Sequence, residues 1–229
     1  MSAPDPAVLL RRVEQVRARV ADAGGDPEDV TLLAVTKGFG PEVALAAATA
    51  GLVDLGENYA QELVAKAPVL ADAGLDPRWH AIGRLQRNKV KALAGIVALW
   101  QTVDRFDLGA EIAKRAPGAT VLVQVNVSDE PQKGGCPPGE APDLVAALVD
   151  AGLDVQGLMT VGRTGPVDEA RAGFAVLRRL ADDLDLPVRS MGMSGDLEAA
   201  VAEGSTMVRV GSALFGPRPS VPGQTAAPR

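Results

Sequence analysis

Apolar and polar positions along the chain follow two periods, one typical of helices and one typical of buried strands. The first stretch, Ala7–Ala23, carries apolar residues at helical spacing and is followed by a pair of glycines. Val30–Lys37 is then a mostly apolar, β-branched run between Asp29 and Gly38, which predicts a buried strand. A helix is predicted over Pro41–Gly51, because proline suits its first turn and glycine its end.

The same alternation of strand and helix continues along the chain. Further strands are predicted at Leu52–Glu57, Trp79–Gly83, Val97–Val103, Thr120–Val127, Val155–Thr160, Val188–Met193 and Met207–Val210. Helices are predicted between them at Tyr59–Ala73, Leu85–Ala94, Phe106–Arg115, Pro142–Ala151, Val167–Leu184 and Asp196–Glu203. Eight such units in about 200 residues predict a closed (β/α)₈ barrel with right-handed crossovers. An open doubly wound sheet is the alternative, disfavoured because no G-x-G-x-x-G turn follows the first strand.

Composition agrees with a single barrel domain, which we expect over residues 1–217 with the additional N-terminal helix. Of the 229 residues 47 % are hydrophobic but only 3 % aromatic, so Val, Leu, Ile and Ala must build most of the core. Such residues suit parallel strands that are covered on both faces. Residues 218–229 lack apolar periodicity and are expected to form a disordered C-terminal tail.

Charge and cysteine content exclude several classes of protein. A formal net charge of −6 argues against a nucleic-acid partner, which would require a basic surface. The only dense basic cluster is interpreted as a solvated helix face: Arg84, Arg87, Lys89 and Lys91. One cysteine, Cys136, and one histidine, His80, make a disulfide or a structural metal site unexpected. Without a signal peptide or a membrane-length apolar run, a cytoplasmic protein is expected.

Lys37 is the sharpest candidate for chemistry. The reactive residues of α/β barrels lie at the carboxyl ends of the strands, and Lys37 is predicted to end an apolar one. Burial disfavours the charged form of a lysine, and the neutral amine is the form that attacks an aldehyde to make an imine. A lysine that leaves the strand for solvent, or that pairs with a carboxylate, is the alternative.

Glycine and serine residues follow the seventh and eighth strands, where barrels usually hold phosphate. Ser194 precedes a predicted helix and can place its hydroxyl on an anion. Gly211 lets the backbone approach a ligand closely, and Ser212 adds a donor. Alternatively, Ser194 only caps a helix and Gly211 only turns the chain.

Three further polar residues are expected at the barrel mouth or wall. Arg209 lies on the eighth strand and can only donate hydrogen bonds, so it would hold a pyridine nitrogen unprotonated unless it pairs with a carboxylate. Asn58 follows the second strand and can bond a ring hydroxyl or the barrel backbone. His80 is more often a hydrogen-bonded wall residue than a general acid or base.

These residues together resemble the pyridoxal phosphate homeostasis proteins (the YggS/PROSC family). The matching segments are Leu33–Lys37, Gly56–Tyr59, Trp79–Lys89, Thr102–Asp104, Val125–Asn126, Gly157–Thr160, Ser190–Ser194 with Asp196, Val208–Gly211 and Phe215–Gly216. The resemblance implies a barrel similar to the alanine racemase N-terminal domain, with pyridoxal 5′-phosphate (PLP) on Lys37 as an internal aldimine. It also implies phosphate contacts at Ser194, Gly211 and Ser212, and a ring-nitrogen contact at Arg209.

The resemblance further implies a carrier for vitamin B6 balance rather than an enzyme. Such a protein buffers PLP, delivers it to apo-enzymes and has no catalytic residue; we expect a monomer. Related racemases complete their site with a second domain and a tyrosine of a partner subunit, whereas no second domain follows this barrel and Tyr59 is the only tyrosine. Loss of a positioned acid or base costs roughly 10²–10⁴-fold in rate. A fold-type-III racemase and a Schiff-base aldolase without PLP are the alternatives.

The match to this family is not uniform along the chain. Val161–Gly165 is less apolar than the resemblance leads us to expect, and Gly195 stands at a variable position. The first departure concerns the loop after the sixth predicted strand. Neither departure touches Lys37.

Overall fold

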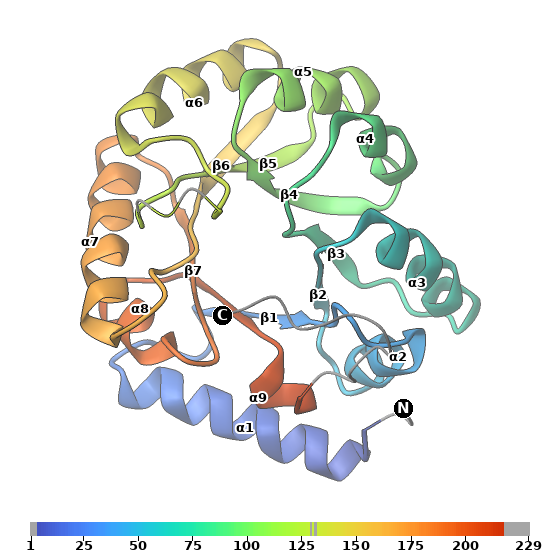
Figure 1. The fold of residues 1–229 in the computed structure, drawn as a ribbon. Helices are drawn as coiled ribbons and strands as arrows, with labels where there is room; N and C mark the ends of the chain where they lie inside the picture. The colour runs from blue at the N-terminus through green and yellow to red at the C-terminus, as the bar shows by residue number, and fades with distance from the viewer. Residues whose placement is uncertain (1–3, 129, 131, 218–229) are drawn as a thin grey trace.

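Eight parallel strands close into a barrel in the order β1 to β8, with β8 pairing back onto β1 (Figure 1). The structure is a computed structural model that describes residues 4–128, 130 and 132–217. The strands are β1 (Thr31–Val35), β2 (Asp54–Glu57), β3 (Arg78–Ala81), β4 (Val97–Val103), β5 (Thr120–Gln124), β6 (Asp154–Met159), β7 (Val188–Met193) and β8 (Met207–Val210). The predicted (β/α)₈ barrel is confirmed. The tail expected at residues 218–229 lies outside the described residues.

Helices surround the barrel, and α1 precedes the first strand (Figure 1). They are α1 (Pro6–Asp22), α2 (Pro41–Thr49), α3 (Ala60–Asp72), α4 (Arg87–Leu93), α5 (Phe106–Arg115), α6 (Ala141–Asp150), α7 (Val167–Asp183), α8 (Leu197–Ala202) and α9 (Ser212–Phe215). A short 3₁₀ helix, η1 (Pro138–Glu140), precedes α6. Neither η1 nor α9 was predicted, because three or four residues are too few to display a helical period.

Strands β1, β3, β5 and β6 end one to three residues earlier than predicted, and all these differences lie at the carboxyl edge of the barrel. β1 stops at Val35, and the chain then turns through Gly38, whose φ of 75° favours glycine. Lys37 therefore lies in the loop after the strand and not on it. β5 stops at Gln124 because Val125 forms a bridge with Cys136, which draws the chain into a loop.

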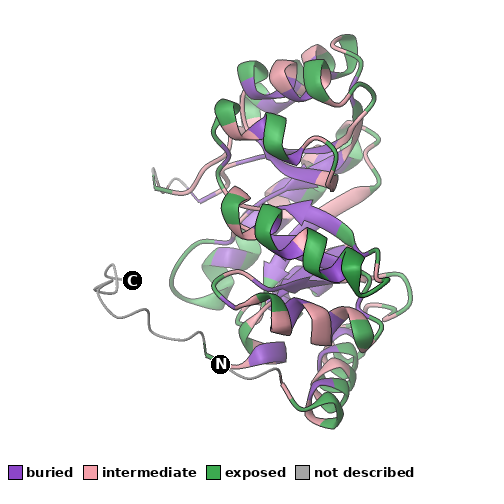
Figure 2. Ribbon diagram, turned by 90° about the vertical axis from the view of Figure 1, so that its right-hand side faces the viewer, coloured by how far each residue is buried: buried purple, intermediate pink, exposed green. Residues whose placement is uncertain are grey.

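The core lies between the strands and their covering helices, as the buried colour of the strands shows in Figure 2. It is mostly Leu, Val and Ala, joined by the fully buried rings of Trp100 and Phe174. Several polar side chains are also buried on the strands, among them His80, Gln101 and Arg209. Over the described residues, no helix combines the length and apolar character needed to cross a membrane.

Candidate functional site

Lys37 occupies the turn that joins β1 to α2 at the carboxyl mouth of the barrel. Its side chain is partly buried. The Thr36 N–H donates to the Gly56 carbonyl at 3.1 Å, which ties the turn to β2, and the Phe39 N–H donates to the Thr36 carbonyl at 3.2 Å within the turn. The Gly38 N–H donates to Oε2 of Glu62 at 2.8 Å. Backbone bonds thus hold the residues on both sides of Lys37.

A buried ionic cluster lies directly against this turn. The Lys66 Nζ donates to the Thr36 carbonyl at 2.9 Å, to Oε1 of Glu57 at 2.6 Å and to Oε2 of Glu62 at 3.1 Å. The Thr36 hydroxyl donates to the same Glu57 oxygen at 2.5 Å. Lys66 and Glu57 are each 2 % exposed. Burial raises the pKa of Glu57 to about 7, although Lys66 and Thr36 favour its ionised form.

The motifs quoted above contain Glu57 but do not include Lys66. One signal in the sequence marks it: Lys66 lies on the apolar face of α3, between the buried Leu63 and Leu70. A lysine at a core position of an amphipathic helix requires a partner, because an unpaired buried charge is very costly. The identity of that partner depends on the tertiary contact between α3 and β2.

Arg209 points into the barrel interior from β8. Its guanidinium donates to the Ser190 carbonyl at 2.7 Å, to the Ser190 hydroxyl at 2.9 Å and to the Thr160 carbonyl at 2.6 Å. Burial lowers the pKa of Arg209 to about 10, with Asp196 opposing the shift, so the group remains charged at neutral pH. Carbonyl and hydroxyl oxygens on β7 and after β6 thus hold Arg209, in place of the carboxylate ion pair considered as the alternative.

A chain of polar contacts leads from this arginine across the barrel interior. The Ser190 hydroxyl donates to Oε1 of Gln101 at 2.7 Å, and Nε2 of Gln101 lies 2.7 Å from Nδ1 of His80. The other ring nitrogen of His80 lies 3.0 Å from Asp54, which also accepts from Arg78 at 2.6 Å. Because the Gln101 amide donates, Nδ1 of His80 accepts and its Nε2 carries the proton. His80 is a hydrogen-bonded wall residue within the barrel.

The loops after β7 and β8 lie against each other. The Ala213 N–H donates to the Ser194 hydroxyl at 3.3 Å, which joins the two loops directly. The N-cap of α8 is Asp196, so Ser194 does not cap that helix. Ser212 is the first residue of α9 and is exposed. A Cβ at Gly211 would lie 3.2 Å from the Val35 carbonyl, so the loop after β8 runs close to the end of β1.

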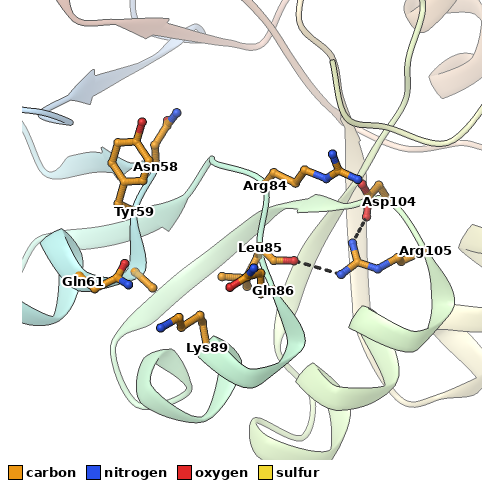
Figure 3. Close-up of a pocket in the computed structure, with 10 residues that line it drawn as sticks. Asn58, Tyr59, Gln61, Arg84, Leu85, Gln86, Lys89, Asp104 and Arg105 are labelled. Atoms are coloured by element: carbon orange, nitrogen blue, oxygen red, sulfur yellow. Dashed lines mark hydrogen bonds and ion pairs between the residues drawn. The ribbon is translucent and has the colours of Figure 1, made fainter. Parts of the chain in front are cut away.

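Asn58 borders a cleft of about 680 Å³ at the same edge of the barrel (Figure 3). Gly83 sets the position of Asn58, because a Cβ on that glycine would lie 2.1 Å from the Asn58 carbonyl. Arg84 and Lys89 also line this cleft. Arg84 precedes α4, so the basic cluster is not one helix face as expected; part of it borders the cleft.

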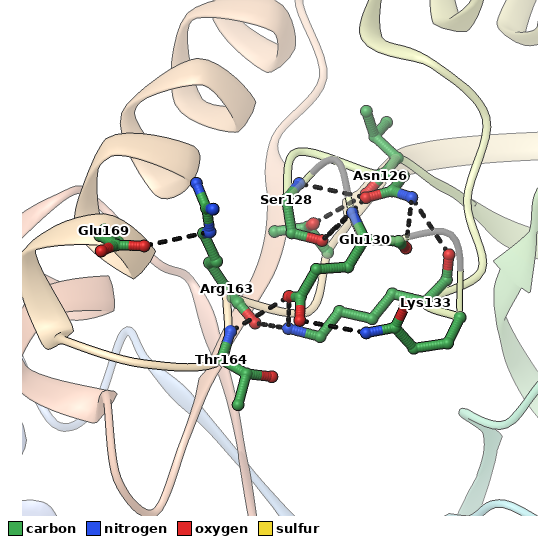
Figure 4. Close-up of polar contacts among 11 residues, drawn as sticks. Asn126, Ser128, Glu130, Lys133, Arg163, Thr164 and Glu169 are labelled. Atoms are coloured by element: carbon green, nitrogen blue, oxygen red, sulfur yellow. Dashed lines mark hydrogen bonds and ion pairs between the residues drawn. The ribbon is translucent and has the colours of Figure 1, made fainter. Parts of the chain in front are cut away.

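The loops after β5 and β6 are joined by a separate polar network (Figure 4). The Lys133 Nζ donates to the Gly162 carbonyl at 2.5 Å and pairs with Glu130. Glu130 also accepts from the Thr164 N–H at 3.1 Å. Asn126 orders the first loop by donating to the carbonyls of Glu130 and Lys133 at 3.2 and 3.1 Å. The Val161–Gly165 segment, which departs from the family pattern, is therefore anchored by its neighbour.

The donor set at the mouth suits a phosphorylated aldehyde with a pyridine ring. Lys37 supplies an amine, Ser194 and Ser212 supply hydroxyls beside backbone N–H groups, and Arg209 supplies a buried cation. The close approach at Gly211 leaves no room for a side chain toward β1. These features lie at or just after the carboxyl ends of the adjacent strands β7, β8 and β1, so the fold brings together most of the residues expected from the sequence. Asn58 follows β2, the other neighbour of β1.

Comparisons with known proteins show the family and the fold of this chain. The family model for the alanine racemase N-terminal domain matches residues 6–219. A pyridoxal phosphate homeostasis protein of Pseudomonas aeruginosa is 40 % identical over 224 residues, 93 % of this chain and 96 % of that protein. PipY of Synechococcus elongatus, solved with PLP bound, is 31 % identical with a TM-score of 0.76, covering 88 % of this chain and all of PipY.

The likeness to complete racemases is limited to the fold. Alanine racemase from Bacillus anthracis superposes with a TM-score of 0.69 at 20 % identity. The match covers 95 % of this chain but only 57 % of that racemase, which is therefore a much longer protein. Over nearly their whole length, by contrast, the homeostasis proteins align with this chain. The chain belongs to the pyridoxal phosphate homeostasis family, whose barrel is that of the alanine racemase N-terminal domain.

Proposed function

We propose that this chain binds PLP covalently on Lys37 and serves as a monomeric cytoplasmic carrier in vitamin B6 homeostasis. It buffers the reactive aldehyde and delivers it to apo-enzymes, and it is not itself an enzyme. The name of its Pseudomonas relative and the PLP bound in PipY support this proposal. The observation that carries it is the position of Lys37 between the loops that hold Gly211 and Asn58. Residues 1–217 form the binding domain.

Each candidate residue is assigned a role in binding PLP that fits the chemistry of its side chain or backbone. The neutral Nζ of Lys37 attacks the aldehyde carbon, a C=N bond replaces C=O, and the oxygen leaves as water. Ser194, Gly211 and Ser212 bind the phosphate through hydroxyl and backbone donors. Arg209 faces the ring nitrogen; because a guanidinium only donates, it keeps that nitrogen unprotonated and makes the ring a poor electron sink.

Asn58 and Tyr59 both line the cleft beside the proposed site. The Asn58 amide is proposed to bond the ring hydroxyl. Tyr59 is the only tyrosine of the sequence, and its side chain is 57 % exposed on the cleft. Its hydroxyl makes no hydrogen bond to a described residue, so no partner among those residues orients it as a proton donor. This supports a carrier over a racemase, which needs a positioned acid or base.

The first experiment locates the bond to PLP. Protein loaded with PLP should absorb in the near-visible, and borohydride should fix the cofactor on the peptide that contains Lys37. The Lys37→Ala variant should lose both signals, whereas the control Lys89→Ala, altered in the neighbouring cleft, should retain them. A reduced adduct that maps to Lys89 or Lys133 in the native protein would contradict the proposal.

The second experiment separates a carrier from an enzyme. Loaded protein is mixed with an apo-enzyme while a phosphatase destroys any free PLP. Recovery of apo-enzyme activity in the presence of the phosphatase supports direct delivery; recovery that the phosphatase abolishes reduces the role to buffering. Alanine racemisation at an ordinary enzymatic turnover, roughly 1–10³ s⁻¹, would overturn the carrier role.

A further inference from the structure

We propose that Lys66, together with Glu57 and Glu62, is a positioning residue that holds the Lys37 turn in the conformation required to accept the cofactor. This inference rests on the proposed attachment of PLP to Lys37. It assigns a role to a buried cation that touches neither the expected phosphate loops nor the cleft. Lys66 acts through the backbone on either side of Lys37.

The contacts of Lys66 use all of its donor capacity. An ammonium has three N–H groups, and Lys66 donates to three acceptors, one backbone carbonyl and two carboxylate oxygens. The carbonyl belongs to Thr36, so its contact fixes the peptide plane that leads into Lys37. The two carboxylates come from different elements, Glu57 at the end of β2 and Glu62 on α3. Lys66 thereby joins β1, β2 and α3 at one point.

Glu57 and Glu62 each accept a separate hydrogen bond from the turn that contains Lys37. Glu57 accepts from the Thr36 hydroxyl at 2.5 Å, and Glu62 accepts from the Gly38 N–H at 2.8 Å. Both neighbours of Lys37 are therefore bonded to one cluster, which restricts the backbone torsions on either side of it. Restricting the backbone of Lys37 in this way lowers the conformational entropy lost when its amine binds the cofactor.

Burying the charges of this cluster has a desolvation penalty, which indicates that the cluster does more than stabilise the fold. Lys66 occupies a core position between Leu63 and Leu70, where an apolar residue would avoid desolvating a charge. Oε2 of Glu57 is buried and has no hydrogen-bond partner among the described residues, so the cluster is not fully satisfied. A purely structural role would be filled as well, or better, by apolar packing.

The test compares Lys66→Met, Lys66→Arg and the exposed control Lys91→Met. In the cofactor-free protein, amide hydrogen exchange of residues 36–39 should accelerate in Lys66→Met relative to wild type, with strands β4 to β6 unchanged. The apparent affinity for PLP should fall about ten- to a hundredfold, as misplacement of a reacting group predicts. Lys66→Arg should recover part of both effects, and Lys91→Met should match wild type.

A second variant tests the same role in case Lys66→Met does not fold. Glu62 is 29 % exposed in its side chain, so Glu62→Ala should keep the fold while removing the acceptor of the Gly38 N–H. Its exchange should rise at Gly38, and its PLP affinity should fall by less than that of Lys66→Met.

The outcomes distinguish this inference from the function on which it rests. If wild type carries PLP on Lys37 while Lys66→Met and Glu62→Ala bind it as tightly and show unchanged exchange at the turn, the positioning role is wrong. Lowered thermal stability with both readouts unchanged would also overturn it. If wild type forms no adduct on Lys37, the proposed function fails, whatever exchange at residues 36–39 shows.

Discussion

Arg209 and Glu57 are both buried in this barrel, but they differ in how fully their polar atoms are hydrogen-bonded. Arg209 donates to two backbone carbonyls and a hydroxyl, so its charge is solvated by fixed protein dipoles. Glu57 shares one oxygen with Lys66 and Thr36, while its other oxygen is buried without a partner among the described residues. The guanidinium therefore stays charged near neutrality, whereas the carboxylate titrates close to it.

The raised pKa of Glu57 predicts a stability that falls with pH. Burial raises this pKa from its ordinary 4.5 to about 7, so between these values the folded state holds a proton that the unfolded state has lost. The free energy of unfolding should thus decrease as pH rises from about 4.5 to about 7, and remain lower above that range. Glu57→Gln removes the titrating group and should flatten this decrease.

Urea unfolding of both proteins at pH 5 and pH 8 provides the measurement. Glu28→Gln serves as the control, because the Glu28 side chain is 82 % exposed and pairs only with Arg17 among the described residues. The control should keep the pH dependence of wild type. A difference between pH 5 and pH 8 that is equal in wild type and Glu57→Gln would contradict the assignment.

The single cysteine should be inert in the folded protein. Cys136 is 5 % exposed, and its backbone is bonded to Gln124 and Asn126 at 2.9 Å each. Burial raises the pKa of its thiol to about 11, so little of the reactive thiolate exists at pH 8. Iodoacetamide should label native protein slowly and urea-unfolded protein rapidly, as followed by mass spectrometry. Equal labelling rates in the two states would show that this loop is open.

At the scale of elements, the hydrophobic pattern predicts the strands better than the loops. The bounds of β4, β7 and β8 agree with prediction, because their apolar runs end at clear breaks in the sequence. β5 ends early because Val125 pairs with Cys136, a partner eleven residues away that no local pattern reveals. The position of Lys37 and of the phosphate-loop candidates at the carboxyl mouth was predictable, because barrels place chemistry at strand ends. The Lys66 cluster was not, since its contacts join separate elements.

Close contact between two loops gives a prediction for the element that carries Asn58. A Cβ at Gly83 would lie 2.1 Å from the Asn58 carbonyl and 2.6 Å from its Cα, and both atoms are backbone. Gly83→Ala must therefore move the loop after β2, at a cost of about 1–3 kcal/mol. Gly95→Ala is the matched control, because nothing lies within 4 Å of its added Cβ.

Thermal unfolding and PLP titration of these two variants check the prediction. Gly83→Ala should unfold at a lower temperature and bind PLP less tightly, because the displaced loop carries Asn58. Gly95→Ala should retain wild-type values in both measurements. Wild-type stability of Gly83→Ala would mean that the two loops separate without cost.

At the scale of the whole molecule, the N-terminal helix braces the last two strand–helix units of the barrel. α1 lies alongside α8 and α9 (Figure 1). Arg19 donates to the Ser194 carbonyl at 2.9 Å and pairs with Glu198 at 2.6 Å. Arg12 donates to the Leu214 carbonyl at 2.8 Å. One helix thus bonds the backbone of the loop after β7 and of α9, which carry Ser194 and Ser212 of the proposed phosphate site. Residues of α1 therefore support a site formed by the last two strand–helix units.

This bracing predicts an effect on phosphate recognition in particular. In a variant that combines Arg12→Ala with Arg19→Ala, the loop after β7 and α9 each lose a backbone contact, and affinity for PLP should fall roughly three- to tenfold, the range expected for such hydrogen bonds. Pyridoxal, which lacks the phosphate, should bind the variant as it binds wild type. Arg17→Ala is the control, because Arg17 lies on the same helix but pairs with the exposed Glu28. Equal loss of affinity for PLP and pyridoxal would show that α1 supports the barrel as a whole and not the phosphate loops.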